Sequence, residues 1–154
     1  MGSEDLHYST GTEKIITTIK GWNILPLICY DLRFPIWSRN KWQIKNNELV
    51  ADYDVLIYIA NWPEVRSYAW KQLLIARAIE NQCYVVGVNR IGKDGNGFNH
   101  TGDSVVINPL GEIISKTKAN QESVETVTLD YEFLASIRKK FPVGLDADNF
   151  TILI

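Results

Sequence analysis

Three short runs of apolar residues constrain the fold of this chain more than any other feature. They occupy residues 24–29, 54–61 and 83–88, and a fourth, residues 104–108, ends at the turn Pro109-Leu110-Gly111. Runs of this length, bounded by turn residues, are typical of strands that are buried within a sheet. Because helical patterns lie between them, the sequence predicts a layered α/β fold, and nothing in its 154 residues requires a second domain.

The segments between these runs supply the other elements. Residues 13–20 and a turn at 21–23 predict a hairpin that leads into the first run, and a short helix is expected over 34–42. A longer helix is expected from Ser67, as N-cap, to about Gln82. Its apolar stripe consists of Trp70, Leu73, Leu74 and Ala78, widened by Ile75 and Ile79. Residues 123–130 predict an exposed edge strand, and a last helix begins near Tyr131.

Composition excludes several classes of partner. A net charge of −2 spread over 34 charged residues gives no basic surface for nucleic acid and no polybasic patch for a membrane. The longest apolar runs are far too short to span a bilayer. Two cysteines and an N-terminus without a signal-peptide pattern indicate a reducing, cytoplasmic protein. The expected partner is therefore a small molecule or another protein.

Cys29 is the first candidate for chemistry. A thiol at the end of a buried strand and before a helix is held where backbone amides can face a developing oxyanion, which suits nucleophilic acyl chemistry. Buried cysteines more often pack as small hydrophobic residues, and position alone favours that interpretation. Cys83 has no charged neighbour in the sequence that would activate it, and we assign it to the core.

A thiol nucleophile requires a base, and the chain contains only two histidines, His7 and His100. A pair of Cys29 and His100 is one hypothesis, although a solvated histidine is the commoner case in such a glycine-rich loop. The spacing of cysteine and histidine predicts no metal site. Gly92, Gly95 and Gly97 lack the following Lys-Ser/Thr of a phosphate loop, and they indicate turns.

Several motifs in one order resemble the nitrilase, or carbon–nitrogen hydrolase, superfamily. The motifs are Ile28-Cys29-Tyr30-Asp31-Leu32-Arg33-Phe34-Pro35, Ala60-Asn61-Trp62-Pro63, Ala76-Arg77-Ala78-Ile79-Glu80-Asn81, Gly102-Asp103-Ser104, and Asn108-Pro109 followed by Gly111-Glu112. The resemblance covers nearly the whole chain and is greatest to the omega-amidase type, which hydrolyses the terminal amide of 2-oxo dicarboxylic acid monoamides. It implies a four-layer α-β-β-α sandwich, of which this chain would be an incomplete, C-terminal portion. It implies no cofactor.

The resemblance also implies roles for individual residues. Cys29 matches the nucleophile, the backbone N–H of Tyr30 matches an oxyanion donor, and Glu4 matches a second glutamate that supports the substrate amide. The glutamate base and the lysine of such enzymes would both lie before Met1, so the chain alone is expected to be nearly inactive. Position alone would make Glu4 a solvated acid. Asp31 and Arg33 are expected to form an ion pair that shapes the turn.

Further residues are candidates for the pocket. Asn61 and Trp62 follow the strand next to that of Cys29, where α/β folds expose ligand contacts. Arg66 could bind a substrate carboxylate, although a surface arginine is the more frequent explanation. Missing strands would leave sheet edges and apolar faces open, so a homodimer or association with an N-terminal segment is expected. Two other hypotheses remain: a self-sufficient Cys–His hydrolase, and a non-catalytic interaction module that retained the fold.

Overall fold

The structure is a computed structural model that describes residues 6–9, 11, 13–148 and 150. The elements of this part are β1 (Thr17–Ile19), β2 (Trp22–Ile28), the 3-10 helix η2 (Cys29–Arg33), α1 (Pro35–Ser38), β3 (Trp42–Lys45), β4 (Glu48–Ala51), β5 (Val55–Ala60), η3 (Glu64–Arg66), α2 (Ser67–Asn81), β6 (Tyr84–Asn89), β7 (Ile91–Lys93), β8 (Asn99–Thr101), β9 (Val105–Ile107), α3 (Tyr131–Lys140) and η4 (Val143–Asp146).

The four predicted apolar runs form β2, β5, β6 and β9 of the main sheet, and β1 comes from the predicted hairpin; the strand order is β1-β2-β5-β6-β9. Strands β2, β5 and β6 are parallel, while β1 and β9 pair antiparallel at the two edges. The register places Ile28 beside Ile59, and Ile59 beside Val88. The carboxyl ends of the three parallel strands therefore lie together at one edge of the sheet. The hairpins β3–β4 and β7–β8 form two separate small sheets.

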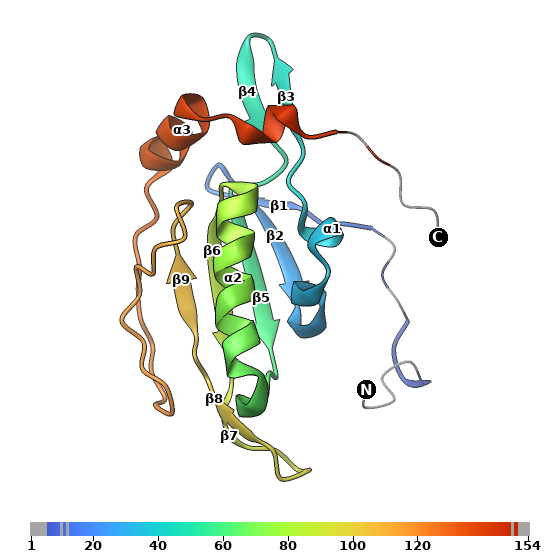
Figure 1. Cartoon of the computed structure of the whole chain (residues 1–154), viewed down its shortest axis with the longest axis vertical. Helices are drawn as coiled ribbons and strands as arrows, with labels where there is room; N and C mark the ends of the chain where they lie inside the picture. The colour runs from blue at the N-terminus through green and yellow to red at the C-terminus, as the bar shows by residue number, and fades with distance from the viewer. Residues whose placement is uncertain (1–5, 10, 12, 149, 151–154) are drawn as a thin grey trace.

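Helix α2 covers one face of this sheet (Figure 1). Its buried stripe includes the predicted Trp70, Leu74 and Ala78, whereas Ile79 is half exposed. The helix approaches most closely at Gly87, because a Cβ atom there would lie 2.5 Å from Leu74 Cδ1 and 3.0 Å from Trp70 Cζ2. Apolar burial against α2 therefore fixes the sheet on this side.

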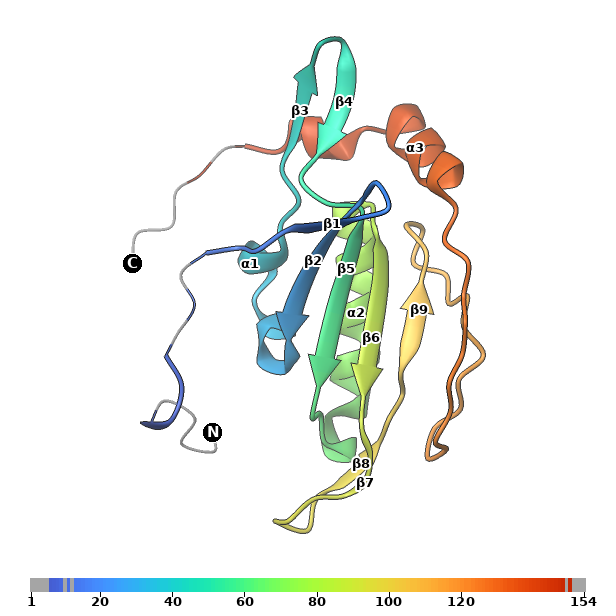
Figure 2. The same cartoon turned by 180° about the vertical axis from the view of Figure 1, so that it is seen from behind.

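Figure 2 shows the opposite face of the sheet from behind. At the amino ends of β5 and β6 this face is covered by α3, whose Leu134 is buried together with Val55 and Tyr84. At the carboxyl ends of the strands the side chains are exposed: Ile28 is 71% accessible, Ile59 59% and Val88 46%. Apolar groups in the middle of a sheet are normally covered by a second layer. The predicted α/β architecture is thus present: in the described residues, the main sheet has α2 along one face and α3 over one end of the other face.

A buried ion pair ties α3 to the sheet at the end opposite Cys29. Arg138 Nη1 lies 2.7 Å from Asp54 Oδ1, and both side chains are less than a tenth exposed. The same guanidinium donates to the carbonyl oxygens of Gln82 and Tyr53 at 2.9 and 2.8 Å. These bonds hold α3 where the strands β5 and β6 begin.

Three expectations about local structure are wrong. The helix predicted over 34–42 is limited to α1, because Asn40 is buried and bonded to Asn81 and Tyr53, and Trp42 begins β3. Residues 123–130 form no strand: their alternating pattern has no partner strand in the described part of the chain. Ser67 is the first helical residue rather than the N-cap, and its hydroxyl donates to Asp103.

In the part of the chain that is described, no helix is both long and apolar enough to cross a membrane.

Candidate active site

Cys29 lies where β2 ends and the 3-10 turn η2 begins, as expected for a strand-end nucleophile. It is partly buried and packs against the core under α2. Its φ of 39° is in the left-handed region, which is uncommon for a residue with a side chain. Conformations of this kind are unfavourable and cluster at functional sites, where the surrounding structure enforces them. The backbone of this turn is therefore held by its neighbours.

Two sets of hydrogen bonds hold the turn. Asp31 Oδ2 accepts from the backbone N–H of Ile28 at 2.9 Å, which closes the turn around Cys29. From behind, Arg77 of α2 donates through Nη2 to the carbonyl oxygen of Leu32 at 2.6 Å. Arg33 forms no ion pair with Asp31 among the described residues, so that expectation is wrong. Its guanidinium instead lies 4.9 Å from the ring centroid of Trp62, a cation–π contact.

The segment after β5 presents two of the predicted pocket residues and buries the third. Asn61 and Arg66 are exposed, but Trp62 is only 3% accessible. The Trp62 indole donates to the carbonyl oxygen of Arg66 at 2.8 Å, and its ring lies 5.5 Å from that of Trp70. Trp62 is therefore a buried residue on whose ring the Arg33 guanidinium packs.

Asn89, at the end of β6, joins the loops around the site, and the sequence motifs did not indicate it. Its side chain accepts from the N–H of Trp62 at 2.8 Å and donates to the carbonyl oxygens of Trp62 and Gly102 at 3.0 and 2.9 Å. An amide side chain is suited to this task because it carries both donors and an acceptor. A polar residue directly after the buried run 83–88 is the signal that could have revealed it.

Asp103 fastens the loop before β9 to the start of α2. Its carboxylate accepts from Ser67 at 2.7 Å and Thr101 at 2.5 Å, and lies 2.8 Å from Lys71 Nζ. Burial raises the pKa of this carboxyl, but the hydrogen bonds from Lys71, Thr101 and Ser67 outweigh that effect, so the pKa lies below its usual value. The loop is thus anchored by a carboxylate that stays ionised.

The structure does not assemble the Cys29–His100 pair. His100 is 1% accessible, its Nδ1 lies 3.1 Å from the carbonyl oxygen of Phe98, and its Nε2 has no hydrogen-bond partner among the residues that the structure describes. His7 is exposed, and Glu4 lies outside the described residues. Cys83 is fully buried, which raises the pKa of its thiol and disfavours the reactive thiolate.

No group of three or more His, Cys, Asp or Glu side chains that could hold a metal ion occurs within the described ranges.

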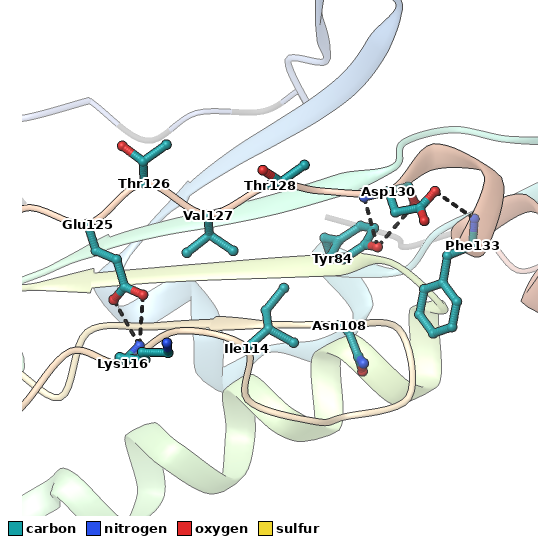
Figure 3. Close-up of a pocket in the computed structure, with 10 residues that line it drawn as sticks. All are labelled: Tyr84, Asn108, Ile114, Lys116, Glu125, Thr126, Val127, Thr128, Asp130 and Phe133. Atoms are coloured by element: carbon teal, nitrogen blue, oxygen red, sulfur yellow. Dashed lines mark hydrogen bonds between the residues drawn. The ribbon is translucent and has the colours of Figure 1, made fainter.

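Neither of the two main cavities includes Cys29 in its lining. One, of about 540 Å³, lies between the ends of β6 and β9 and residues 125–130, where Tyr84 and Asp130 hydrogen-bond each other (Figure 3). The other, of about 880 Å³, opens at the carboxyl end of β6 and includes Asn89 and Arg90.

Comparison with protein families identifies the chain. The family described as carbon-nitrogen hydrolase matches residues 3–139, which is most of the sequence. The chain belongs to the carbon-nitrogen hydrolase family. The superfamily inferred from the motifs around Cys29 is thereby confirmed, and with it the α/β fold fragment seen in the structure.

Several members of the carbon-nitrogen hydrolase family are similar to this chain. Omega-amidase YafV of Escherichia coli strain K12 is 51% identical over 152 residues, which cover 99% of this chain and 56% of that protein. The 2-oxoglutaramate amidase of Bacillus subtilis strain 168 is 36% identical over 141 residues, covering 91% of this chain and 51% of the relative.

Among solved structures, XC1258 from Xanthomonas campestris is a CN-hydrolase superfamily protein with an arsenic adduct in its active site. It superposes with a TM-score of 0.91 at 46% identity, over 98% of this chain and 56% of that one. The chain thus spans little more than half the length of the relatives it matches. The comparisons do not bear out the narrower expectation that it is the C-terminal portion of such an enzyme.

Proposed function

We propose that this chain carries the nucleophile of an amidase that hydrolyses the terminal amide of small 2-oxo dicarboxylic acid monoamides. The observation that carries the proposal is Cys29, held in a left-handed conformation at the carboxyl end of a central parallel strand. The substrate class is supported by the omega-amidases and the 2-oxoglutaramate amidase to which the chain is similar.

The proposed reaction proceeds through a thioester. The Cys29 thiolate attacks the amide carbon, so that a C–S bond forms and the carbonyl oxygen becomes an oxyanion, to which the N–H of Tyr30 donates. The C–N bond then breaks, and the nitrogen leaves as ammonia after taking up a proton. Water attacks the thioester in a second step, which releases the carboxylic acid and restores the thiol. Glu4 supports the substrate amide.

A complete site needs groups from the length of the family members that this chain does not span. We assign to that part the glutamate that deprotonates the thiol or water and the lysine that faces the oxyanion. The loss of one oxyanion donor alone can lower a rate by about 10²–10³, so the chain by itself is expected to be nearly inactive. The same part would supply the second half of a four-layer α-β-β-α sandwich and cover the open sheet face.

The remaining features of the proposal concern the substrate and the assembly. We propose that Arg66, exposed on η3, pairs with the free carboxylate of the substrate and that Asn61, exposed after β5, contacts the substrate. Trp62 acts from below by supporting Arg33. We expect a homodimer or association with the missing part of the domain, in a reducing, cytoplasmic setting where a thiol nucleophile persists.

The test is ammonia release from 2-oxoglutaramate. The 154-residue chain is compared with a chimera completed by the part of E. coli YafV that it does not cover, each also carrying Cys29→Ala or Cys83→Ala. We expect release by the completed form only, abolished by Cys29→Ala and retained by Cys83→Ala. Turnover by the short chain, or release that survives Cys29→Ala, would refute the proposal.

A further inference from the structure

Arg77 is a buried arginine behind the turn that carries Cys29. The side chain is only 4% exposed and lies on the face of α2 that also holds Trp70, Leu74 and Ala78. Nη2 donates to the carbonyl oxygen of Leu32 at 2.6 Å, and Nη1 lies 2.9 Å from Glu80 Oε1. Its Nε has no hydrogen-bond partner within the described residues. The guanidinium therefore makes one bond inward to the turn and one outward to a half-exposed carboxylate.

The fold alone does not account for a charge at this position. Burial of a guanidinium is costly, and an apolar side chain of similar volume often packs equally well in such a stripe. Glu80, with a side chain 43% exposed, offsets little of that cost because water screens it. What the arginine adds is the charged bond to Leu32, and such bonds are stronger and more directional than neutral ones.

Leu32 lies one turn of 3-10 helix after Cys29. In a helix of three residues per turn, side chains three positions apart lie on the same side. Leu32 is fully buried, and Cys29 packs against the core cluster that contains Leu32. A bond that fixes the Leu32 carbonyl group thus fixes the backbone that presents the thiol.

We propose that Arg77 is a positioning residue for Cys29. Arg77 holds the turn so that Cys29, its first residue, keeps its left-handed conformation, and it provides a fixed positive charge behind the thiol. This inference rests on the proposed function, in which Cys29 is the nucleophile. A fixed cation near a thiol favours the thiolate, which is the reactive form of cysteine.

Other charged or titratable groups around the turn are few. Those on η2 and on the elements packed against it are Tyr30, Asp31 and Arg33 in the turn itself, Tyr58 in β5, and Tyr68, Lys71, Arg77 and Glu80 in α2. Strand β2 and helix α1 contribute none. Of the α2 groups, Arg77 is the one that bonds to the backbone of the turn.

The test is the pH profile of Cys29 alkylation by iodoacetamide in the 154-residue chain with Cys83→Ala, followed by intact mass. We expect Arg77→Met to slow alkylation about tenfold at pH 7, the size expected for one charge-assisted bond. The rates should converge at high pH, where the thiol is fully ionised in both proteins. Arg77→Lys keeps the positive charge on a different side chain, so its alkylation rate at pH 7 should fall by less than that of Arg77→Met. Arg77→Lys also serves as the test variant if Arg77→Met does not fold.

The matched control is Arg138→Met, which removes another buried arginine at the far end of the sheet and should leave the pH profile of Cys29 alkylation unchanged. Glu80→Gln, which leaves the bond between Arg77 and Leu32 in place, is a second control. An unchanged profile in the Arg77 variants would overturn the inference. So would a change by one factor at every pH, because that reports accessibility alone. Failure of the proposed function is read separately, from ammonia release in Cys29→Ala.

Discussion

At the scale of single residues, Gly87 shows how tightly the sheet is packed beneath the site. A Cβ atom at this position would lie 2.5 Å from Leu74 Cδ1, well inside van der Waals contact. We predict that Gly87→Ala lowers the free energy of unfolding by about 1–3 kcal/mol, because the core of α2 must shift to admit it. Urea denaturation monitored by tryptophan fluorescence measures the change.

Gly95 provides the matched control for that substitution. No atom lies within 4 Å of a Cβ built there, so Gly95→Ala should be neutral or stabilise the chain by up to about 1 kcal/mol. Equal effects of the two substitutions would show that α2 does not pack on β6 as described.

The residue scale also shows what sequence reasoning could reach. The apolar run predicts Cys29 at a strand end, and that position is confirmed, whereas its role as nucleophile is implied by the resemblance of residues 28–35 to the nitrilase superfamily. The roles of Arg77 and Asn89 were missed because each depends on a backbone group far away in the sequence. Trp62 was expected in a pocket wall, but whether it faces outward depends on Trp70 and Arg33, which no local pattern places.

At the scale of elements, Asp103 connects the start of α2 to the loop before β9. Burial raises the pKa of this carboxyl, but the hydrogen bonds from Lys71, Thr101 and Ser67 lower it by more. The pKa therefore lies below its usual value. A carboxyl with a depressed folded-state pKa adds stability above its unfolded value, about 3.9, and that stability is lost as the pH falls through the folded value. We predict that Asp103→Asn lowers the free energy of unfolding at pH 7 by about 1–3 kcal/mol.

The pH dependence distinguishes this role from a general packing effect. The difference in unfolding free energy between wild type and Asp103→Asn should narrow as the pH falls below about 4, because the unfolded chain then binds a proton at Asp103 that the folded protein takes up only at lower pH. Urea titrations at a series of pH values provide the measurement. A gap that stays constant in acid would mean that the charge of Asp103 does not hold the loop.

Elements whose pattern is strong were predicted well, and those that depend on partners were not. The buried strands β5, β6 and β9 and the helices α2 and α3 follow from apolar runs and helical spacing. The β3–β4 hairpin was missed, although Asn46 and Asn47, both with positive φ, form a recognisable turn signal. Residues 123–130 alternate like a strand, but a strand exists only where another strand pairs with it.

At the scale of the whole molecule, the dominant feature is the sheet face that stays uncovered at the carboxyl ends of the strands. Ile59 lies near the end of β5 on this face and is 59% exposed, between Ile28 and Val88. We predict that Ile59→Lys reduces binding of a hydrophobic dye and self-association of the 154-residue chain, at a cost of about 1 kcal/mol or less in stability. The same change should prevent assembly with the YafV part of the proposed chimera, because a lysine buried at that interface would have no partner.

Ile44→Lys is the control for that prediction. Ile44 is 58% exposed but lies in the β3–β4 hairpin, away from the main sheet. Ile44→Lys should therefore change neither the binding of the hydrophobic dye nor the assembly. Ile59→Lys that still assembles into an active enzyme would show that this face is not an internal interface.

The most direct test of the thioester mechanism is to trap the acyl group on Cys29. The completed enzyme is quenched with acid during turnover of 2-oxoglutaramate, and its peptides are analysed by mass spectrometry. If Cys29 is the nucleophile, we expect a thioester on the peptide that contains Cys29, none on Cys83, and none in Cys29→Ala. Ammonia release without any adduct on Cys29, together with full activity of Cys29→Ala, would contradict it.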